Sequence, residues 1–350
     1  MAERIPVTVL TGYLGAGKTT LLNRILSEDH GRRYAVIVNE FGEIGIDNDL
    51  ILNSDEELFE MNNGCICCTV RGDLIRTLHA LLSKKSDFDA IIVETTGLAD
   101  PGPVAQTFFM DAFLQERTAL DSVTTVIDAR HILLRLHDSR EAVEQVAFAD
   151  QMVLNKTELV TAEELDSIEA RLRRINPLAP IHRAQRANVS LEKVLGRGGF
   201  DIARIVSLEP DFLAPAHGEA GHVHDEHCGH AHADHGHDSH HDHVHDAGIR
   251  SIALTSSAPM DGERIRMWLN ALVSSKGGDI LRAKGIIDVR DESRRLVFQS
   301  VHMLLEGDLQ QAWKPGEARY SRLVFIGRNL DEHLLRKGFE SCVAPPVVWQ

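Results

Sequence analysis

Apolar and polar positions follow two different periods along the first two hundred residues of the chain. Short runs that are almost continuously apolar predict strands buried on both faces of a parallel sheet. They are PVTVLTG, RYAVIVNE, DAIIVETTG, SVTTVIDA and DQMVLNK. Helical periodicity lies between them, at 19–26, 73–83 and 162–175. This alternation of strand and helix predicts a doubly wound, mostly parallel α/β domain over residues 1–205.

The same periods restart near residue 249. Strands are predicted in the runs IRSIALTS, GIIDVRD, RRLVFQSV and SRLVFIG. Amphipathic stretches at 261–273 and 330–339 predict helices. Residues 249–350 are therefore expected to form a second, smaller α+β domain.

The segment between these two parts has a different composition. Residues 217–246 hold twelve of the nineteen histidines, together with seven carboxylates and Cys228, but no Lys or Arg. A stretch with so few apolar side chains has nothing with which to build a core. We therefore expect residues 206–248 to be a disordered linker.

Composition and charge exclude several classes of protein. The formal net charge of −15 argues against nonspecific binding to nucleic acid, which needs clustered Lys and Arg. No apolar run reaches the length of a membrane span, and the first residues carry no secretory signal, so a cytoplasmic protein is expected. The five cysteines are odd in number and three are clustered, which is not the pattern of a secreted disulfide framework.

The run GYLGAGKT matches the phosphate-loop pattern G-x-x-x-x-G-K-[ST] in full. It follows a predicted strand and opens a predicted helix, which is the arrangement that phosphate binding requires. Gly12, Gly15 and Gly17 permit the backbone N–H groups to face phosphate oxygens. Lys18 is expected to contact the β- and γ-phosphates and Thr19 to offer a hydroxyl to Mg²⁺. This run predicts a nucleotide site.

A second part of that site is predicted in AIIVETTGLADP. Glu94 ends an apolar strand, where a carboxylate can hold Mg²⁺ and its waters, and the N–H of Gly97 can sense the γ-phosphate. The alternative is that Glu94 is a strand-end acid that only caps a loop.

VLNKTEL, which follows the last of these strands, is similar to the guanine-reading N/T-K-x-D element of GTPases. Asn155 would orient the loop, Lys156 would pack on the base, and Glu158 would accept hydrogen bonds from guanine. Glu158 is one methylene longer than the usual Asp, so adenine stays open as an alternative base.

The run NGCICC places Cys65, Cys67 and Cys68 within four positions. Thiolates are soft ligands that suit Zn²⁺, or Co²⁺ in its place. A fourth ligand would come from elsewhere, and Glu40 and Glu43 are candidates. A redox pair made by the first and last of these cysteines, and a buried cluster without a ligand, are the alternatives.

The chain resembles the CobW-like family of metal-handling GTPases through five motifs. In chain order they are TGYLGAGKTTLL, VNEFGEIGID, NGCICC, ETTGLADPGP and NKTEL. The resemblance continues through ILRAKGIID, LVFQSVH and RLVFIG in the last hundred residues. It implies a SIMIBI-type P-loop domain followed by a CobW C-terminal domain. The implied activity is slow GTP hydrolysis coupled to delivery of a transition metal, often zinc, to client metalloproteins.

The resemblance also implies where these functions lie. Some members of the family are linked to cobalt in cobalamin synthesis, so the metal is not fixed by the resemblance. By match to the family motifs, phosphate binding falls on Gly12, Gly15, Ala16, Gly17, Lys18, Thr19 and Thr20, base binding on Asn155 and Lys156, and metal binding on Cys65, Cys67 and Cys68.

The expected mechanism is a switch in which GTP with Mg²⁺ orders residues 39–68 and so raises metal affinity at the cysteines. The histidine tract would add weak sites, among them those at His222, His224, His227 and His230. The alternatives are a zinc-storage protein that uses this tract, a cobalt chaperone and a small-molecule kinase. The apolar tail CVAPPVVWQ leaves homodimerisation open.

Overall fold

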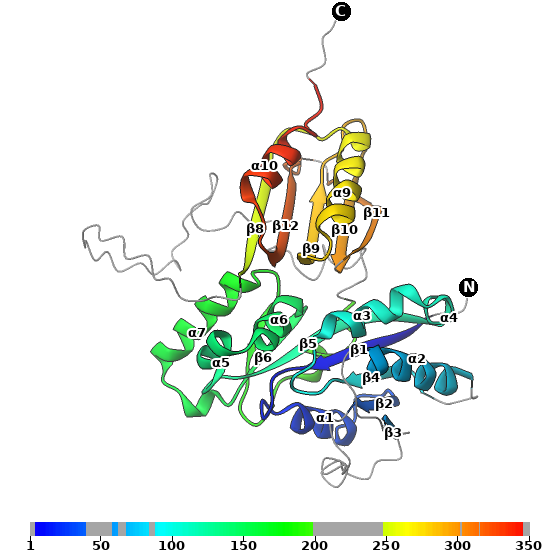
Figure 1. The fold of residues 1–350 in the computed structure, drawn as a ribbon, viewed down its shortest axis with the longest axis vertical. Coiled ribbons are helices and arrows are strands. Elements are labelled where there is room, and N and C mark those ends of the chain that lie inside the picture. Colours follow the sequence, from blue (N-terminus) through cyan, green and yellow to red (C-terminus); the bar gives the residue numbers. More distant parts are fainter. Residues whose placement is uncertain are drawn as a thin grey trace, which may run out of the picture.

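The computed structural model describes residues 4–39, 58–61, 68–83, 88–198, 248–301, 303–314 and 316–345, with the backbone alone described at 39, 58–61 and 68–71. In these residues the chain forms two separate sheets, each covered by its own helices (Figure 1).

The first sheet has seven strands in the order β3-β2-β4-β1-β5-β6-β7, and every neighbouring pair is parallel. Because β1 lies at the centre and the chain continues to either side of it, the loop after β1 leaves the carboxyl edge at a switch point, where open α/β sheets bind ligands. The strands are β1 Ile5–Thr11, β2 Tyr34–Asn39, β3 Leu58–Met61, β4 Ala90–Glu94, β5 Thr118–Asp128, β6 Gln151–Asn155 and β7 Ile181–Arg183.

Helices cover both faces of this sheet. One face packs against α1 and the segment 184–195, and the opposite face packs against the other helices of this half. The helices are α1 Lys18–Ser27, α2 Cys68–Ser83, α3 Pro101–Met110, α4 Ala112–Arg117, α5 Ile132–Asp138, α6 Arg140–Phe148 and α7 Ala162–Ile175.

Side-chain caps fix where several helices begin. Asp100 accepts a hydrogen bond from the N–H of Gly102 at the start of α3, and Pro101 occupies the first helical position, where its missing N–H costs nothing. Thr161 and Glu164 form a reciprocal capping box at the start of α7. The sequence therefore sets these boundaries locally, before tertiary packing is considered.

The second sheet has five antiparallel strands in the order β11-β10-β9-β12-β8. One of its faces packs against α9 and α10, in a cluster that includes Leu269, Phe325 and Phe339. The elements are β8 Ile249–Ser256, α9 Gly262–Lys276, β9 Ile280–Ile287, β10 Arg294–Val301, β11 Leu304–Ala312, β12 Ser321–Arg328 and α10 Glu332–Glu340.

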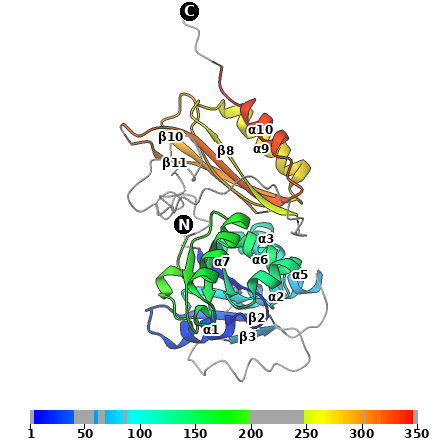
Figure 2. The ribbon, with the colours of Figure 1, turned by 90° about the vertical axis from the view of Figure 1, so that its left-hand side faces the viewer.

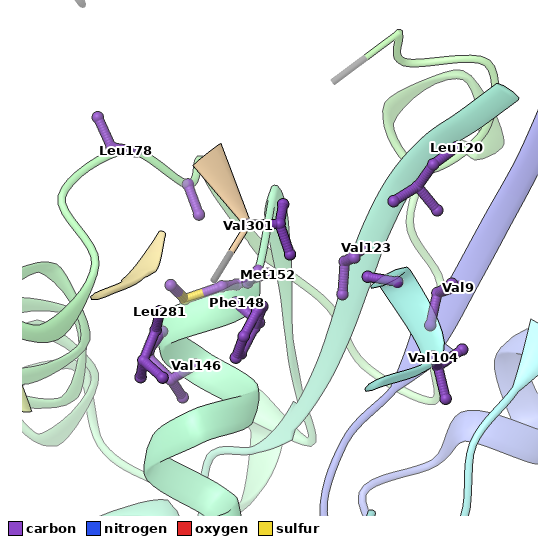
Figure 3. Packing of buried hydrophobic residues seen from close by; sticks show 14 of the residues in the cluster. Val9, Val104, Leu120, Val123, Val146, Phe148, Met152, Leu178, Leu281 and Val301 are labelled. Atoms are coloured by element: carbon purple, nitrogen blue, oxygen red, sulfur yellow. The ribbon is translucent and has the colours of Figure 1, made fainter. Parts of the chain in front are cut away.

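The other face of the second sheet joins the core of the first domain. Leu281 on β9 and Val301 on β10 belong to the same buried cluster as Val146, Phe148 and Met152 (Figure 3). Figure 2 shows the second sheet next to α3, α6 and α7, and each of these helices contacts one of its strands. The two domains therefore share one continuous apolar core.

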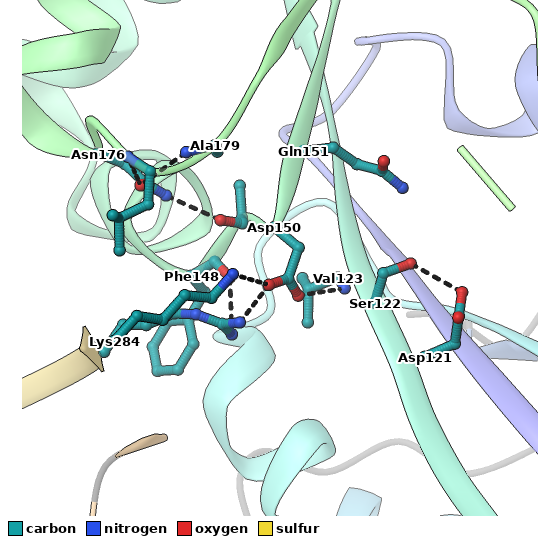
Figure 4. Close-up of polar contacts among 12 residues, drawn as sticks. Asp121, Ser122, Val123, Phe148, Asp150, Gln151, Asn176, Ala179 and Lys284 are labelled. Atoms are coloured by element: carbon teal, nitrogen blue, oxygen red, sulfur yellow. Dashed lines mark hydrogen bonds and ion pairs between the residues drawn. The ribbon is translucent and has the colours of Figure 1, made fainter. Parts of the chain in front are cut away.

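A buried polar cluster lies within this shared core. Arg282 and Lys284 on β9 are each 1% exposed, and both pair with Asp150 just before β6, the Lys284 Nζ at 3.4 Å (Figure 4). The second carboxylate oxygen of Asp150 accepts a 2.8 Å hydrogen bond from the N–H of Val123. Because one carboxylate pairs with two cations from the other domain, removing it would leave both buried charges without this anion.

The predicted fold class is confirmed, and the predicted strands of the first half correspond to β1, β2, β4, β5 and β6. One strand prediction in the second domain is displaced. The run GIIDVRD was expected to be a strand, whereas β9 spans Ile280–Ile287 and therefore begins five residues earlier. The reason is that β9 carries Arg282 and Lys284, two charges that a buried strand does not normally contain.

In the part of the chain that the structure describes, no helix combines the length and the apolar content that crossing a bilayer requires.

Candidate functional site

The loop between β1 and α1 has a shape that its glycines make possible. Gly12 has φ 142° and Gly17 has φ 106°, both in the region that favours glycine. A Cβ on Gly12 would lie 2.1 Å from the carbonyl oxygen of Val126, and one on Gly17 would lie 2.5 Å from Nδ2 of Asn155. Gly15 also has a positive φ, of 72°, but a Cβ there would meet nothing within 4 Å. The loop is therefore closed against β5 and β6 and open near Gly15.

Lys18 begins α1 and is only 9% exposed. Its Nζ donates to the carbonyl oxygens of Gly12, at 2.9 Å, and Tyr13, at 3.5 Å. The ammonium group thus lies beneath the loop, beside the positive end of the helix dipole. Thr19 is half-buried and Thr20 is exposed on the same first turn. A cradle of positive-φ glycines, a buried cation and a helix N-terminus together fit a polyphosphate.

Glu94 is the last residue of β4, is 6% exposed and lies opposite Leu10 in the parallel register with β1. The residue after it, Thr95, donates its hydroxyl to that of Thr11 at 2.9 Å. A Cβ on Gly97 would lie 2.6 Å from the backbone nitrogen of Leu14. The loop after β4 is therefore packed directly on the phosphate loop, as a γ-phosphate sensor must be.

Asn155 at the end of β6 joins two loops. Its Nδ2 donates to the carbonyl of Ala16 at 2.9 Å, and its Oδ1 accepts from the N–H of Ala187 at 2.7 Å. One side chain therefore fixes the phosphate loop relative to the loop after β7. The structure brings Asn155 and the phosphate loop together, as the base-reading prediction requires.

Lys156 adopts φ 61° and directs its Nζ to Oδ2 of Asp128 at 2.8 Å. Burial raises the pKa of Asp128, but hydrogen bonds from Lys156 and His131 outweigh it and hold that pKa below its usual value. Asp128 is therefore ionised at neutral pH and orients the lysine. Glu158 lies in the 3₁₀ turn Thr157–Leu159 and is exposed, so it is accessible to a ligand.

A cavity of about 400 Å³ opens beside the first residues of the phosphate loop. Its walls include Tyr13 from the loop, Asp128 from the end of β5, Arg135 from α5 and Gln145 from α6. Sequence reasoning singled out none of these four. Asp128 follows the apolar part of the run SVTTVIDA and ends β5 at the same sheet edge as Glu94, which was a usable signal, whereas Gln145 carries no local signal.

The predicted metal site lies almost wholly outside the described residues. This holds for Cys65, Cys67, Glu40, Glu43 and the four histidines, while Cys68 begins α2 with only its backbone described. Among the residues that are described, no group of three or more His, Cys, Asp or Glu side chains could hold a metal ion. The metal assignment therefore stays a prediction.

Comparison with protein families identifies both domains. The family described as CobW/HypB/UreG, nucleotide-binding domain, matches residues 6–183, and the cobalamin synthesis protein cobW C-terminal domain matches residues 249–343.

Individual relatives match over most of the chain. The zinc chaperone YjiA of Escherichia coli strain K12 is 35% identical over 340 residues, covering 96% of this chain and 98% of that protein. The zinc-regulated GTPase metalloprotein activator 1 of Schizosaccharomyces pombe is 41% identical over 215 residues, covering 59% of this chain and 50% of that protein. The crystal structure of the Zn(II)-bound YjiA GTPase from E. coli superposes with a TM-score of 0.74 at 31% identity, covering 98% of this chain and all of that one. The resemblance inferred from the motifs is confirmed, and the chain belongs to the CobW family of P-loop proteins with a CobW C-terminal domain.

Proposed function

We propose that this chain is a GTP-hydrolysing metallochaperone that binds zinc and delivers it to client proteins. The observation that carries the proposal is the phosphate loop, whose glycines at positions 12 and 17 exclude a side chain and whose lysine is buried beneath it. Relatives named as zinc chaperones and as zinc-regulated GTPases support the choice of nucleotide and of metal.

The phosphate chemistry is assigned to residues at the carboxyl edge of the parallel sheet. Lys18 neutralises negative charge on the β- and γ-phosphates, and the hydroxyl of Thr19 and the carboxylate of Glu94 would hold Mg²⁺. When bound, Mg²⁺ stabilises charge that develops on the phosphate oxygens. The N–H of Gly97 senses whether the γ-phosphate is present. These four residues therefore separate the GTP state from the GDP state.

The base is assigned to the loop that Asn155 anchors. Lys156, oriented by Asp128, packs on the plane of the base, and Glu158 accepts from guanine N1 and N2. Because Glu158 is exposed on a short turn, its extra methylene can be accommodated by a small shift of the side chain. Measuring the ratio of GTP to ATP affinity tests this assignment, and equal affinities would reject guanine reading.

Zinc, the cargo, is assigned to the thiolates of Cys65, Cys67 and Cys68, with Glu40 or Glu43 completing the set. Cys68 begins α2, and the chain before it leads from β3, the edge strand of the parallel sheet whose central strand β1 precedes the phosphate loop. A GTP-dependent change in that connection alters metal affinity, and thermodynamic linkage then requires zinc to change GTP affinity by the same factor. Cobalt is the alternative cargo.

Competitive zinc titration of the full chain tests the proposal, with Mg²⁺ and a nonhydrolysable GTP analogue, with GDP, and without nucleotide. We expect the analogue to raise the affinity of one tight site by about tenfold, equivalent to about 1.4 kcal/mol of coupling. Changing Cys65, Cys67 and Cys68 together to Ser should remove that site. Cys342→Ser is the matched control, because Cys342 is a free, buried cysteine of the second domain whose thiol pKa burial raises.

The twelve histidines of residues 217–246 favour a second function, zinc storage. Deleting that tract separates the two functions. A chaperone keeps its tight, nucleotide-dependent site after the deletion, whereas a store loses most of its bound zinc. Retention of most zinc by the triple cysteine variant, with no response to nucleotide, would favour storage over delivery.

A further inference from the structure

Gln145 on α6 holds the loop that follows β4. It is 1% exposed, and its Nε2 donates to the carbonyl oxygens of Gly97, at 3.0 Å, and Ala99, at 3.1 Å. The backbone carbonyl of Gln145 accepts a hydrogen bond from the hydroxyl of Thr125 on β5 at 2.8 Å. A single buried amide thus uses both of its hydrogens to fix two carbonyls of the same loop.

The preceding residue on α6, Glu144, contacts the second domain. Glu144 is 3% exposed and accepts from Nε of Arg140 at 2.6 Å and from Nη2 of Arg328, at the end of β12. Burial and the positive charge of Arg140 hold the pKa of Arg328 below its usual value, and the carboxylate of Asp100, which caps α3 immediately after Ala99, acts in the opposite direction. The second domain therefore places a guanidinium against the residue that precedes Gln145 on α6.

The other side of this loop is set by the phosphate loop. Gly97 approaches Leu14 so closely that a Cβ would lie 2.6 Å from its backbone nitrogen. The loop that begins at Gly97 thus lies between the phosphate loop and Gln145 of α6, and α6 in turn contacts Arg328 of β12 through Glu144. Any change in how Gly97 faces the γ-phosphate must be accommodated by Gln145 or transmitted to Arg328, because closely packed interiors do not deform continuously.

We propose that Gln145 is a positioning residue for GTP hydrolysis, and that the adjacent Glu144–Arg328 contact couples the second domain to the γ-phosphate loop. The amide holds the two loop carbonyls so that the Gly97 N–H points to the γ-phosphate. The arginine makes the docking of the second domain depend on the same loop geometry. This inference rests on the proposed GTPase function, and its tests distinguish the failure of one from the failure of the other.

The first test compares two buried glutamines. Gln151, at the start of β6, is also 1% exposed and donates from Nε2 to the hydroxyl of Thr124, at 2.7 Å, and the carbonyl of Val194, at 2.9 Å. It lies at the opposite end of its strand from Asn155, so Gln151→Leu removes a similar amide without touching the γ-phosphate loop.

We expect Gln145→Leu to lower the ratio of GTP-analogue to GDP affinity by about tenfold, equivalent to about 1.4 kcal/mol, and to lower kcat more than it changes KM. Gln151→Leu should destabilise the fold to a similar extent in urea and leave the ratio unchanged. If both variants, or neither, change the ratio, Gln145 has only a structural role. If the wild-type chain itself hydrolyses no GTP, the proposed function fails instead.

An isosteric variant adds a readout that a packing defect cannot produce. Gln145→Glu keeps the shape of the side chain but cannot donate when ionised, and the two carbonyl oxygens then repel it. Protonation restores a donor, and the carbonyls raise the pKa of the introduced carboxyl. The affinity ratio of this variant should therefore recover as the pH falls from about 8 toward about 6, relative to wild type. A flat profile would contradict the donor role.

Substitution of two arginines tests the proposed coupling between the second domain and the γ-phosphate loop. Arg328→Met removes the contact to Glu144, which keeps Arg140 as a partner, and should lower the affinity ratio about threefold. Arg295→Met is the control, because Arg295 is a buried arginine that pairs with Glu317 at 2.5 Å inside the second domain. An unchanged ratio in Arg328→Met, with Gln145→Leu still effective, would confine the inference to the first domain and overturn the coupling.

Discussion

Each of the two domains contains a buried lysine, Lys18 in the first and Lys284 in the second, and the two lysines have different surroundings. Lys284 lies in the middle of β9, 1% exposed, against the carboxylate of Asp150 from the other domain. Lys18 lies where β1 has ended and α1 begins, 9% exposed, against the carbonyls of Gly12 and Tyr13. The contact of Lys284 with Asp150 joins a cation to an anion within the fold, whereas the contacts of Lys18 with Gly12 and Tyr13 join a cation to carbonyl oxygens at a sheet edge.

This difference shows how burial of a charge can serve either structure or binding. The carboxylate next to Lys284 cannot be displaced without leaving a buried charge behind, so that contact holds the domains together. Phosphate oxygens can replace the neutral carbonyls next to Lys18 and leave no charge unpaired, so that contact is compatible with an exchanging ligand. The partner of the buried cation therefore distinguishes the two roles.

Removing the anion should have the largest effect. Asp150→Ala leaves Arg282 and Lys284 buried without their carboxylate and should lower the free energy of unfolding by about 3–5 kcal/mol. Urea unfolding measures this loss. Glu332→Ala, which removes the exposed Arg336–Glu332 pair, is the control and should cost less than about 1 kcal/mol. Equal losses in the two variants would contradict a structural role for the buried cluster.

Removing the other lysine should affect activity more than stability. Lys18→Ala withdraws the cation from the phosphates and should lower the rate of GTP hydrolysis by about 10²–10³-fold. Steady-state release of phosphate measures the rate, and urea unfolding shows whether the fold is kept. Near-normal hydrolysis by a folded variant would place the phosphate site elsewhere.

Two glycines of the phosphate loop show whether its contact with the rest of the fold determines nucleotide affinity. Gly17→Ala adds a Cβ that collides with Asn155, whereas at Gly15 the added Cβ meets nothing and only the positive φ is strained. We expect a loss of GTP-analogue affinity of about tenfold or more for Gly17→Ala, and a smaller loss for Gly15→Ala. Isothermal titration compares them. The reverse order would show that the Asn155 contact does not shape the loop.

A half-buried histidine that lies near two cations gives the smallest effect. Burial, together with Lys193 and Arg197, lowers the pKa of His182 from 6.5 to about 4. Between these values the unfolded chain binds a proton that the folded chain does not, so His182 makes stability fall as the pH drops from 6.5 to 4.

His182→Phe should therefore lose less stability than wild type on acidification from pH 7.5 to 5, as measured by urea midpoints. His333→Gln, at an exposed position of α10, should follow the wild-type profile. Parallel profiles for wild type and His182→Phe would show that His182 is not held neutral.

The sequence predicted those features that depend on neighbouring residues. The strand runs of the first domain are apolar throughout, and the phosphate-loop glycines are adjacent in sequence, so both were visible. β9 was placed too late because its charges find their partner 132 residues away. β11 was missed because LLEGDLQQA pairs only with β10 at the sheet edge and has no sustained apolar alternation.

The residues of the candidate site also divide into those that a local sequence motif predicts and those whose roles depend on distant partners. Lys18, Glu94 and Asn155 belong to short motifs, and the structure brings them to one sheet edge. Asp128 and Gln145 gain their roles from partners on other elements, Lys156 for the first and the carbonyls of Gly97 and Ala99 for the second. Such roles follow from three-dimensional packing, and no local pattern encodes them.

The contact between Asn155 and Ala16 has a consequence for synthesis on the ribosome. These residues are 139 positions apart, and Asn155 is itself held by the N–H of Ala187. A nascent chain therefore lacks the Asn155 contact that shapes its phosphate loop until nearly two hundred residues have been made. At translation rates of about 5–20 residues per second, the loop waits about ten seconds or longer after its own residues have emerged. Nucleotide capture is thus postponed until the whole parallel sheet is available, before the second domain has been completed.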